Sequence, residues 1–330
     1  MKILHIGIGP LGQKVVQFAV ERGLEIVAAV DLAPDKVGRD LGESCGLAPL
    51  NVPVRGSIAE ALTDSKPDVA VVTTVSSLAK LEPTITELAQ SKVSMVSTCE
   101  ELFFPWITQP ELARRIDETC RENGVSCLGT GVNPGFLMDY LTTILTGLCQ
   151  KVRSVNVWRL QDASIRRVPF QEKIGAGLTL EQFKEKAATG VLRHVGLLES
   201  VDFIAHQLGW KLDSRTESLK PVVANVEVTT GHKPIATGMS RGVEQIARGF
   251  VDHQEIITLT FRASVGEPES VDGIAIHGNP SVHAAIPGGV NGDIATCAIA
   301  LNAIPSLLNA TPGLKTMGDI APVTCRRSVT

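Results

Sequence analysis

The sequence MKILHIGIGPLGQKVVQFA, residues 1–19, joins a short apolar strand, a glycine-rich turn and a helical pattern. Gly7, Gly9 and Gly12 have the spacing GxGxxG, and the next apolar run, LEIVAAV, ends in Asp31. The first glycine permits a tight turn, the second lets a pyrophosphate approach the backbone, and the third lets helix and strand pack closely. An ordinary glycine-rich turn is the alternative interpretation. Strand, turn, helix and distal acid together predict a dinucleotide-binding βαβ unit.

Apolar runs and helical patterns alternate through the first 130 residues. The runs VAVVTT and VSMVST are continuous, which is typical of parallel strands buried on both faces. The expected elements are strands over residues 68–74, 93–98 and 125–130 and helices over residues 58–62, 81–90 and 109–123. This alternation predicts an α/β protein with an N-terminal Rossmann domain, doubly wound, over residues 1–130.

From residue 152 the pattern changes to longer strands with alternating polarity, which suits an open sheet with one covered face. The expected strands are VRSVNVWRL (152–160), VVANVEVTT (222–230), HQEIITLTFRASV (253–265) and DGIAIHG (272–278), with helices over 180–188 and 195–208. We therefore expect an α+β substrate-binding and dimerisation domain with an open mixed sheet over residues 131–290. An alanine-rich helix over 291–310, capped by Asn291 or Asp293, is expected to return to the first domain.

The composition excludes several classes of protein. The chain has 330 residues, 44% hydrophobic and 20% charged, with a net charge of −4, so a nucleic-acid partner is not expected. No apolar run is long enough to span a membrane, and because the first strand is expected to begin near Met1 we expect no signal peptide. The seven scattered cysteines contain no CxxC pair and the histidines form no HExxH motif. We expect reduced thiols, a cytoplasmic protein and no metal site.

Ligands of open α/β sheets bind beyond the carboxyl ends of the strands, where the loops TTVSS (73–77), STCEELFFPW (97–106) and GTGVNPGFLMD (129–139) are expected. Glu100 and Glu101 are the most reactive groups in these loops. One of them could face the cofactor and exchange protons, or both could be first-turn acids that complement a helix dipole. The apolar residues around the pair favour the functional interpretation.

Three motifs, STCEELFFPW, GTGVNPGFLMD and IPGGVNGDIAT (286–296), resemble those of 2,4-diaminopentanoate dehydrogenases and the related native amine dehydrogenases, whose architecture is similar to that of dihydrodipicolinate reductase. The resemblance covers nearly the whole chain, including DASIRR (162–167), KIGAGL (173–178) and RHVGLLES (193–200). It implies an NAD(P)-dependent oxidoreductase acting on CH–NH2 donors. The reaction would be reductive amination of small ketones or aldehydes with ammonia, or the reverse deamination of amines. It also implies a catalytic glutamate in the CEEL segment, with Glu101 slightly preferred over Glu100.

Alternatives remain. The substrate could be 2,4-diaminopentanoate or another amino acid, whose carboxylate would need a cation such as Arg166 or Arg167. A non-catalytic NAD(P)-sensing regulator is the alternative from another class, but the glutamates that it could lose are present. The absence of adjacent histidines argues against dihydrodipicolinate reductase activity itself.

Loop position and resemblance supply the other candidate residues. The candidates for cofactor binding are Gly7, Gly9, Pro10, Leu11, Gly12, Asp31, Lys36, Arg39, Thr73, Thr74, Val75, Thr98, Cys99 and Asn133. The candidates for the substrate pocket, each of which could equally be core, are Phe103, Trp106, Val132, Phe136, Leu178 and Thr296. Asp31 favours NAD by binding a ribose hydroxyl, whereas Lys36 and Arg39 could hold a 2′-phosphate, so we expect NAD or NADP. An exposed sheet face in the second domain predicts a homodimer.

Overall fold

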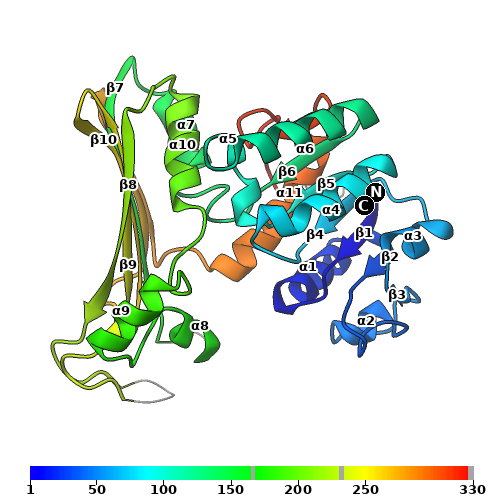
Figure 1. Cartoon of the computed structure of the whole chain (residues 1–330), viewed down its shortest axis with the longest axis horizontal. Coiled ribbons are helices and arrows are strands. Elements are labelled where there is room, and N and C mark those ends of the chain that lie inside the picture. Colours follow the sequence, from blue (N-terminus) through cyan, green and yellow to red (C-terminus); the bar gives the residue numbers. More distant parts are fainter. Residues whose placement is uncertain (165–167, 230–233, 326–330) are drawn as a thin grey trace. The chain divides into compact units, whose positions relative to one another are not determined.

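The computed structural model describes residues 1–164, 168–229 and 234–325 (Figure 1). The chain divides into two compact units, Met1–Phe136 with Asn291–Thr330 (unit 1) and Leu137–Val290 (unit 2). The chain re-enters unit 1 at Asn291, which is the N-cap of α11 (Gly292–Leu308). Its side-chain oxygen accepts hydrogen bonds from the N–H groups of Asp293 and Ile294, so Asn291 rather than Asp293 caps this helix.

Unit 1 contains, within the described residues, a seven-stranded sheet in the order β13-β6-β5-β4-β1-β2-β3. Its strands are β1 (Lys2–Ile6), β2 (Glu25–Val30), β3 (Val54–Arg55), β4 (Val69–Val72), β5 (Ser94–Ser97), β6 (Ser126–Gly129) and β13 (Gly313–Lys315). All neighbouring pairs are parallel. The order 3-2-1-4-5-6 is that of the doubly wound dinucleotide-binding fold, so the predicted Rossmann domain is confirmed.

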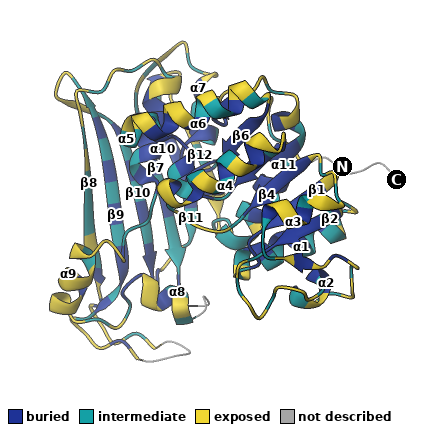
Figure 2. Cartoon of the chain, turned by 45° about the vertical axis from the view of Figure 1, so that its right-hand side comes forward, coloured by how far each residue is buried: buried dark blue, intermediate teal, exposed yellow. Residues whose placement is uncertain are grey.

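Helices cover both faces of this sheet. They are α1 (Pro10–Glu21), α2 (Leu41–Ser44), α3 (Ile58–Thr63), α4 (Leu78–Gln90), the 3-10 turn η1 (Glu100–Leu102), α5 (Pro105–Thr108), α6 (Pro110–Asn123) and α11. α11 packs against α1 and over β4, β5 and β6, while α3, α4 and α6 bury their apolar faces in one core with the strands. Figure 2 shows the strands of this sheet in the buried colour between these helices. Among the described residues, no helix combines the length and apolarity needed to cross a membrane.

Unit 2 contains, in its described part, a six-stranded sheet in the order β12-β11-β7-β10-β9-β8. Its elements are β7 (Lys151–Asp162), β8 (Ser214–Val223), β9 (Ser240–Val251), β10 (Gln254–Ser264), β11 (Val271–Asn279) and β12 (Val282–Pro287), with α7 (Tyr140–Thr146), α8 (Val168–Lys173), α9 (Leu180–Ala188) and α10 (Leu197–Gln207). β7 and β10 pair in parallel and the other pairs are antiparallel, which confirms the predicted mixed sheet. α7 and α10 lie on one face of it (Figure 1).

The strand expected over residues 222–230 is wrong for most of its length. Only its first two residues belong to a strand, because β8 ends at Val223. Further along, Val228 makes only an isolated bridge with Ile235. β8 reads SRTESLKPVV and contains Pro221, which argues against a central strand. At the edge of the sheet, however, a missing N–H costs no ladder hydrogen bond, so the proline is tolerated. The strands β3, β9, β12 and β13 were also not predicted.

Candidate functional site

The turn between β1 and α1 has the geometry that a dinucleotide requires. Gly7 adopts a φ of +94°, and a Cβ on it would lie 2.8 Å from Thr74 Cγ2 and 2.9 Å from the Thr73 carbonyl oxygen. A Cβ on Gly12 would overlap the Gly7 carbonyl oxygen, whereas a Cβ on Gly9 would meet no protein atom within 4 Å. The first and third glycines therefore permit close packing. The space at Gly9, beside the start of α1, fits the pyrophosphate of NAD or NADP.

A cavity of about 550 Å³ lies beside this turn. Seven of the predicted cofactor residues line it, namely Gly7, Gly9, Asp31, Lys36, Thr73, Thr74 and Val75. Lys80 of α4 and Ser57 also line it, which the sequence did not indicate. Pro10, Leu11 and Gly12 form the first turn of α1. Arg39, Thr98, Cys99 and Asn133 are not among the lining residues of this cavity, and the Arg39 side chain is exposed.

Asp31, at the end of β2, is tied to the glycine turn. Its Oδ2 accepts a hydrogen bond of 2.6 Å from the N–H of Ile8, and its Oδ1 accepts one of 2.9 Å from the N–H of Ala33. Burial opposes ionisation of this carboxyl, but the two N–H groups and the ammonium group of Lys36 outweigh it, so the pKa of Asp31 lies below its ordinary value. A stable carboxylate at this position can accept the hydroxyls of a ribose.

His5 supports the same turn from inside β1. The side chain is 1% exposed, and its Nε2 lies 2.9 Å from the Gly7 carbonyl oxygen. Burial lowers the pKa of His5 to about 4, so the ring is neutral at neutral pH and its Nε2–H donates to Gly7. Thr73 Oγ1 donates to the same oxygen at 2.7 Å. A histidine within the apolar run KILHI was the only sequence signal of this support.

Glu100 and Glu101 both lie in η1, just beyond the carboxyl end of β5, but their surroundings differ. Glu101 Oε2 accepts hydrogen bonds from the N–H of Leu78 at 2.8 Å and from Gln109 Nε2 at 3.0 Å. Leu78 is the first residue of α4, whose N-cap Ser77 makes no side-chain hydrogen bond, so Glu101 caps this helix from outside. The carboxylate of Glu100 makes no hydrogen bond or ion pair with any residue that the structure describes.

Cys99, which precedes the pair, is a buried thiol. Its Sγ donates to the Ser76 carbonyl oxygen at 3.2 Å. Burial raises the pKa of Cys99 to about 12, so the group stays protonated at neutral pH and is not a nucleophile.

The candidate pocket residues belong to both units. Val132 and Thr296 meet within unit 1, where the N–H of Val132 donates to Thr296 Oγ1 at 3.2 Å. Phe103 is 1% exposed, and Trp106 packs against the core of unit 1, so the core interpretation fits both of them. Phe136 is half-buried at the end of the first segment of unit 1.

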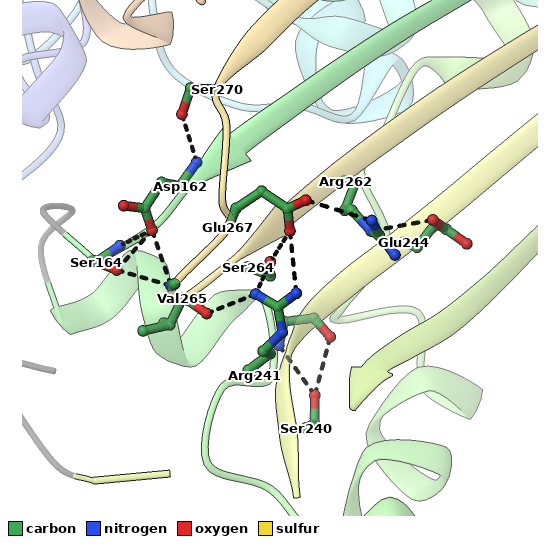
Figure 3. A network of polar contacts seen from close by, with 12 residues as sticks. Asp162, Ser164, Ser240, Arg241, Glu244, Arg262, Ser264, Val265, Glu267 and Ser270 are labelled. Atoms are coloured by element: carbon green, nitrogen blue, oxygen red, sulfur yellow. Dashed lines mark hydrogen bonds and ion pairs between the residues drawn. The ribbon is translucent and has the colours of Figure 1, made fainter. Parts of the chain in front are cut away.

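A polar network lies where β9 begins and β10 ends in unit 2 (Figure 3), and Leu178 is hydrogen-bonded to one of its residues. The N–H of Ser240 donates to the Leu178 carbonyl oxygen at 2.9 Å. The next residue, Arg241, donates to the Val265 carbonyl oxygen at 2.9 Å and pairs with the buried Glu267 at 3.5 Å. The segment that carries Leu178 is therefore anchored to the sheet. Arg166 and Arg167, the proposed carboxylate-binding cations, lie outside the described residues.

These features define a class of protein. A Rossmann sheet, a glycine turn with space for a pyrophosphate, and a carboxylate at the end of β2 belong to an NAD(P)-dependent oxidoreductase. Residues 1–99 match the family model "Dihydrodipicolinate reductase, N-terminus", and residues 136–328 match the model "2,4-diaminopentanoate dehydrogenase C-terminal domain". The chain belongs to the 2,4-diaminopentanoate dehydrogenase family, which confirms the resemblance read from its motifs.

Relatives agree with this assignment. The chain is 32% identical over 335 residues to 2,4-diaminopentanoate dehydrogenase of Acetoanaerobium sticklandii, covering 97% of this chain and 93% of the relative. Its fold is similar to that of an amine dehydrogenase from Mycobacterium smegmatis, with a TM-score of 0.85 and 24% identity over 99% of this chain and 98% of that one. An oxidoreductase from Agrobacterium radiobacter, solved with NAD+, L-tartaric acid and magnesium, has a TM-score of 0.52 and 13% identity over 92% and 86% of the two chains.

Proposed function

We propose that this enzyme is an amine dehydrogenase that converts small ketones or aldehydes, ammonia and NAD(P)H into amines, and that catalyses the reverse deamination. Membership of the 2,4-diaminopentanoate dehydrogenase family supports a reaction at a carbon–nitrogen bond. The observation that carries the proposal is the carboxylate of Glu100, which lies just beyond β5 and forms no hydrogen bond or ion pair with the described residues. β5 is two places from β1 in the sheet, and the carboxyl ends of such parallel strands form the ligand-binding edge.

The chemistry needs one group that moves protons and tolerates a neighbouring cation. Ammonium gives up one proton to form ammonia, which adds to the carbonyl carbon. A proton then passes from nitrogen to oxygen, and the hydroxyl takes up the proton that ammonium released and leaves as water, which gives an iminium ion. We assign the proton transfers to Glu100, whose carboxylate can accept the ammonium proton and return it to the departing hydroxyl. The same negative charge stabilises the iminium ion. When bound, the nicotinamide supplies the hydride that converts the iminium carbon to the amine.

Glu101 has a positioning role in this proposal. Its bonds to Leu78 and Gln109 tie η1 to the start of α4 and to the start of α6 (Pro110–Asn123). A carboxylate that already satisfies two donors is less available for transfer than its neighbour. These two hydrogen bonds support Glu100 rather than Glu101, which the sequence slightly preferred, as the proposed catalytic residue.

A second candidate substrate is 2,4-diaminopentanoate itself. The 32% identity to a relative of that name over nearly the full length of both chains favours it. The two candidates share the reaction and differ only in whether the substrate carries a carboxylate and a second amine.

A homodimer and a cytoplasmic location complete the proposal. The face of the unit 2 sheet opposite α7 and α10 carries the half-buried apolar side chains of Trp158, Leu160 and Ile246, which a second copy of the chain could cover. All seven cysteines lie among the described residues and are free, which supports a reducing compartment.

A spectrophotometric screen tests the proposal. The protein is mixed with NADH or NADPH, ammonium and a panel of small ketones, aldehydes and keto acids, and in the reverse direction with NAD+ or NADP+ and 2,4-diaminopentanoate or simple amines. Ammonium-dependent oxidation of the cofactor by simple ketones supports amine dehydrogenase activity, and turnover confined to the diamino acid supports the second candidate. The Glu100→Gln variant is the matched control. No amine-linked turnover in either direction would refute the proposed function.

A further inference from the structure

Lys36 and Asp31 both bind the backbone of Ile8, one residue of the glycine turn. Lys36 Nζ lies 3.2 Å from Asp31 Oδ2 and donates at 3.0 Å to the carbonyl oxygen of Ile8. The same Oδ2 accepts the N–H of Ile8. Both polar groups of the residue between Gly7 and Gly9 are thus held by this pair. The Lys36 side chain is 24% exposed and lines the 550 Å³ cavity, so the pair faces the space that the cofactor fits.

A carboxylate at the end of β2 ordinarily excludes NADP, because it repels the phosphate on the ribose 2′ position. In this chain the ammonium group beside Asp31 balances that charge. An ammonium group has three donors, and two of those of Lys36 are used by Asp31 and Ile8. The third remains for a group in the cavity, and an ammonium is a common partner for phosphate.

We propose that Lys36 is the specificity-determining residue of the cofactor pocket: its ammonium group neutralises Asp31 and binds the 2′-phosphate, so that the pocket admits NADP as well as NAD. Asp31 then positions Ile8 and binds the ribose without excluding the phosphate. This inference concerns the cofactor alone and is independent of the proposed amine substrate.

Two other cations serve as matched controls. Lys80 lines the same cavity from α4 and is exposed, but it has no bond to Asp31. Arg39 follows Lys36 closely in sequence, yet its exposed side chain is not among the lining residues. Replacing either of them with methionine removes one positive charge without touching the pair of Lys36 and Asp31.

The test is calorimetric titration of the cofactor-free protein with 2′,5′-ADP and with 5′-AMP, which differ only in the 2′-phosphate. Lys36→Met should weaken 2′,5′-ADP binding roughly 10- to 100-fold, the worth of one charge-assisted hydrogen bond, and leave 5′-AMP binding within about threefold. Lys36→Arg retains the charge and should keep 2′,5′-ADP binding within about threefold of the unchanged protein. Lys80→Met and Arg39→Met should weaken both ligands by similar, small factors.

Several outcomes would overturn the inference. If Lys36→Met weakened the binding of both ligands equally, Lys36 would stabilise the glycine turn but would not bind the 2′-phosphate. If Lys80→Met or Arg39→Met selectively weakened the binding of 2′,5′-ADP, the 2′-phosphate would bind at that residue and not at Lys36. Failure of the unchanged protein to bind 2′,5′-ADP would remove the site altogether. Because neither ligand contains the nicotinamide, none of these results depends on whether the enzyme acts on amines.

Discussion

Arg159 and Asp272 face each other across β7 and β11 and together hold both polar groups of a third residue, Val290. Arg159 Nη1 lies 3.2 Å from Asp272 Oδ1, the N–H of Val290 donates to Asp272 Oδ2 at 2.8 Å, and Arg159 Nη2 donates to the Val290 carbonyl oxygen at 2.6 Å. Arg159 is 2% exposed and Asp272 6% exposed. Val290 is the last residue of unit 2, so a buried ion pair fixes the point from which the chain leaves this unit.

This ion pair predicts a strong asymmetry between single and double substitutions. Asp272→Asn removes the carboxylate that faces this buried guanidinium group, and we expect a loss of about 3–5 kcal/mol in the free energy of unfolding of unit 2. Arg159→Met combined with Asp272→Leu removes both charges and should cost much less. Urea unfolding, followed by a probe in unit 2, measures both. Equal losses in the two variants would show that the charges do not act as a pair.

The assignment of the glutamates predicts different effects for two conservative substitutions. Glu100→Gln should lower kcat on the order of 100-fold, because the amide cannot exchange protons, while the Kd for the cofactor stays nearly unchanged. Glu101→Gln keeps an oxygen that accepts from Leu78, and it should have a small effect. Steady-state kinetics in the amination direction, with cofactor binding as the control, separate them. The reverse ranking would make Glu101 the catalytic residue, and near-full activity in both would make the segment structural.

The two glycines of the turn predict opposite phenotypes for the same change. Gly9→Ala should leave the unfolding midpoint nearly unchanged, since its Cβ meets no protein atom within 4 Å, but it should weaken NADPH and NADH binding at least about 10-fold by filling the pyrophosphate space. Gly12→Ala should lower the melting temperature because its Cβ overlaps the Gly7 carbonyl oxygen. Thermal melts and fluorescence titration of the cofactor provide both readings. Normal cofactor affinity in Gly9→Ala would place the pyrophosphate elsewhere.

Asp31 predicts a shift in cofactor preference together with a general loss. Asp31→Ser should raise the ratio of kcat/KM for NADPH to that for NADH, because the ammonium group of Lys36 loses the carboxylate that neutralises it and attracts the 2′-phosphate more strongly. It should also weaken the binding of both cofactors, because the N–H groups of Ile8 and Ala33 lose their hydrogen-bond acceptors. An unchanged ratio would remove Asp31 from the ribose site.

His5 predicts an acid-sensitive component of stability. Its pKa falls from an ordinary value of 6.5 to about 4 in the folded protein. Between these two values the unfolded chain binds the proton and the folded chain does not, so stability decreases as the pH falls through this window. The full effect is about 3 kcal/mol. His5→Gln should flatten the pH dependence of the urea unfolding midpoint between pH 7 and pH 4, relative to the unchanged protein. The same slope in both would exclude His5 as its source.

The parts of the fold that the sequence predicted are those in which one local pattern meets one physical requirement. Gly7 and Gly12 are required by a tight turn and a packing contact, and Gly9 leaves open space where a pyrophosphate would fit; all three glycines are visible in six residues of sequence. β8 could not be recognised because its Pro221 and its polar residues are tolerated only at an edge, and the sequence does not reveal which strand lies there.

The roles of the paired glutamates could not be separated for a similar reason. Glu101 is distinguished by Leu78, 23 residues earlier, and by Gln109, eight residues later. No sequence motif at either partner indicates that a residue distant in sequence caps the helix. The hydrogen bond from Lys36 to Ile8, 28 residues away, likewise depends on the pairing of β1 with β2. The glycine turn was therefore predictable from local sequence, whereas the contacts that distinguish neighbouring candidate residues are tertiary.

Pro221 also limits how copies of this protein can aggregate. A sheet edge ordinarily offers a row of free N–H and C=O groups to which a strand of another molecule can add, and repeated addition gives fibres. At the β8 edge Pro221 has no N–H, and the neighbouring Lys220 is an exposed charge. Both features block the growth of the sheet at this edge. Self-association is thereby directed away from open-ended polymers and toward contacts of limited size.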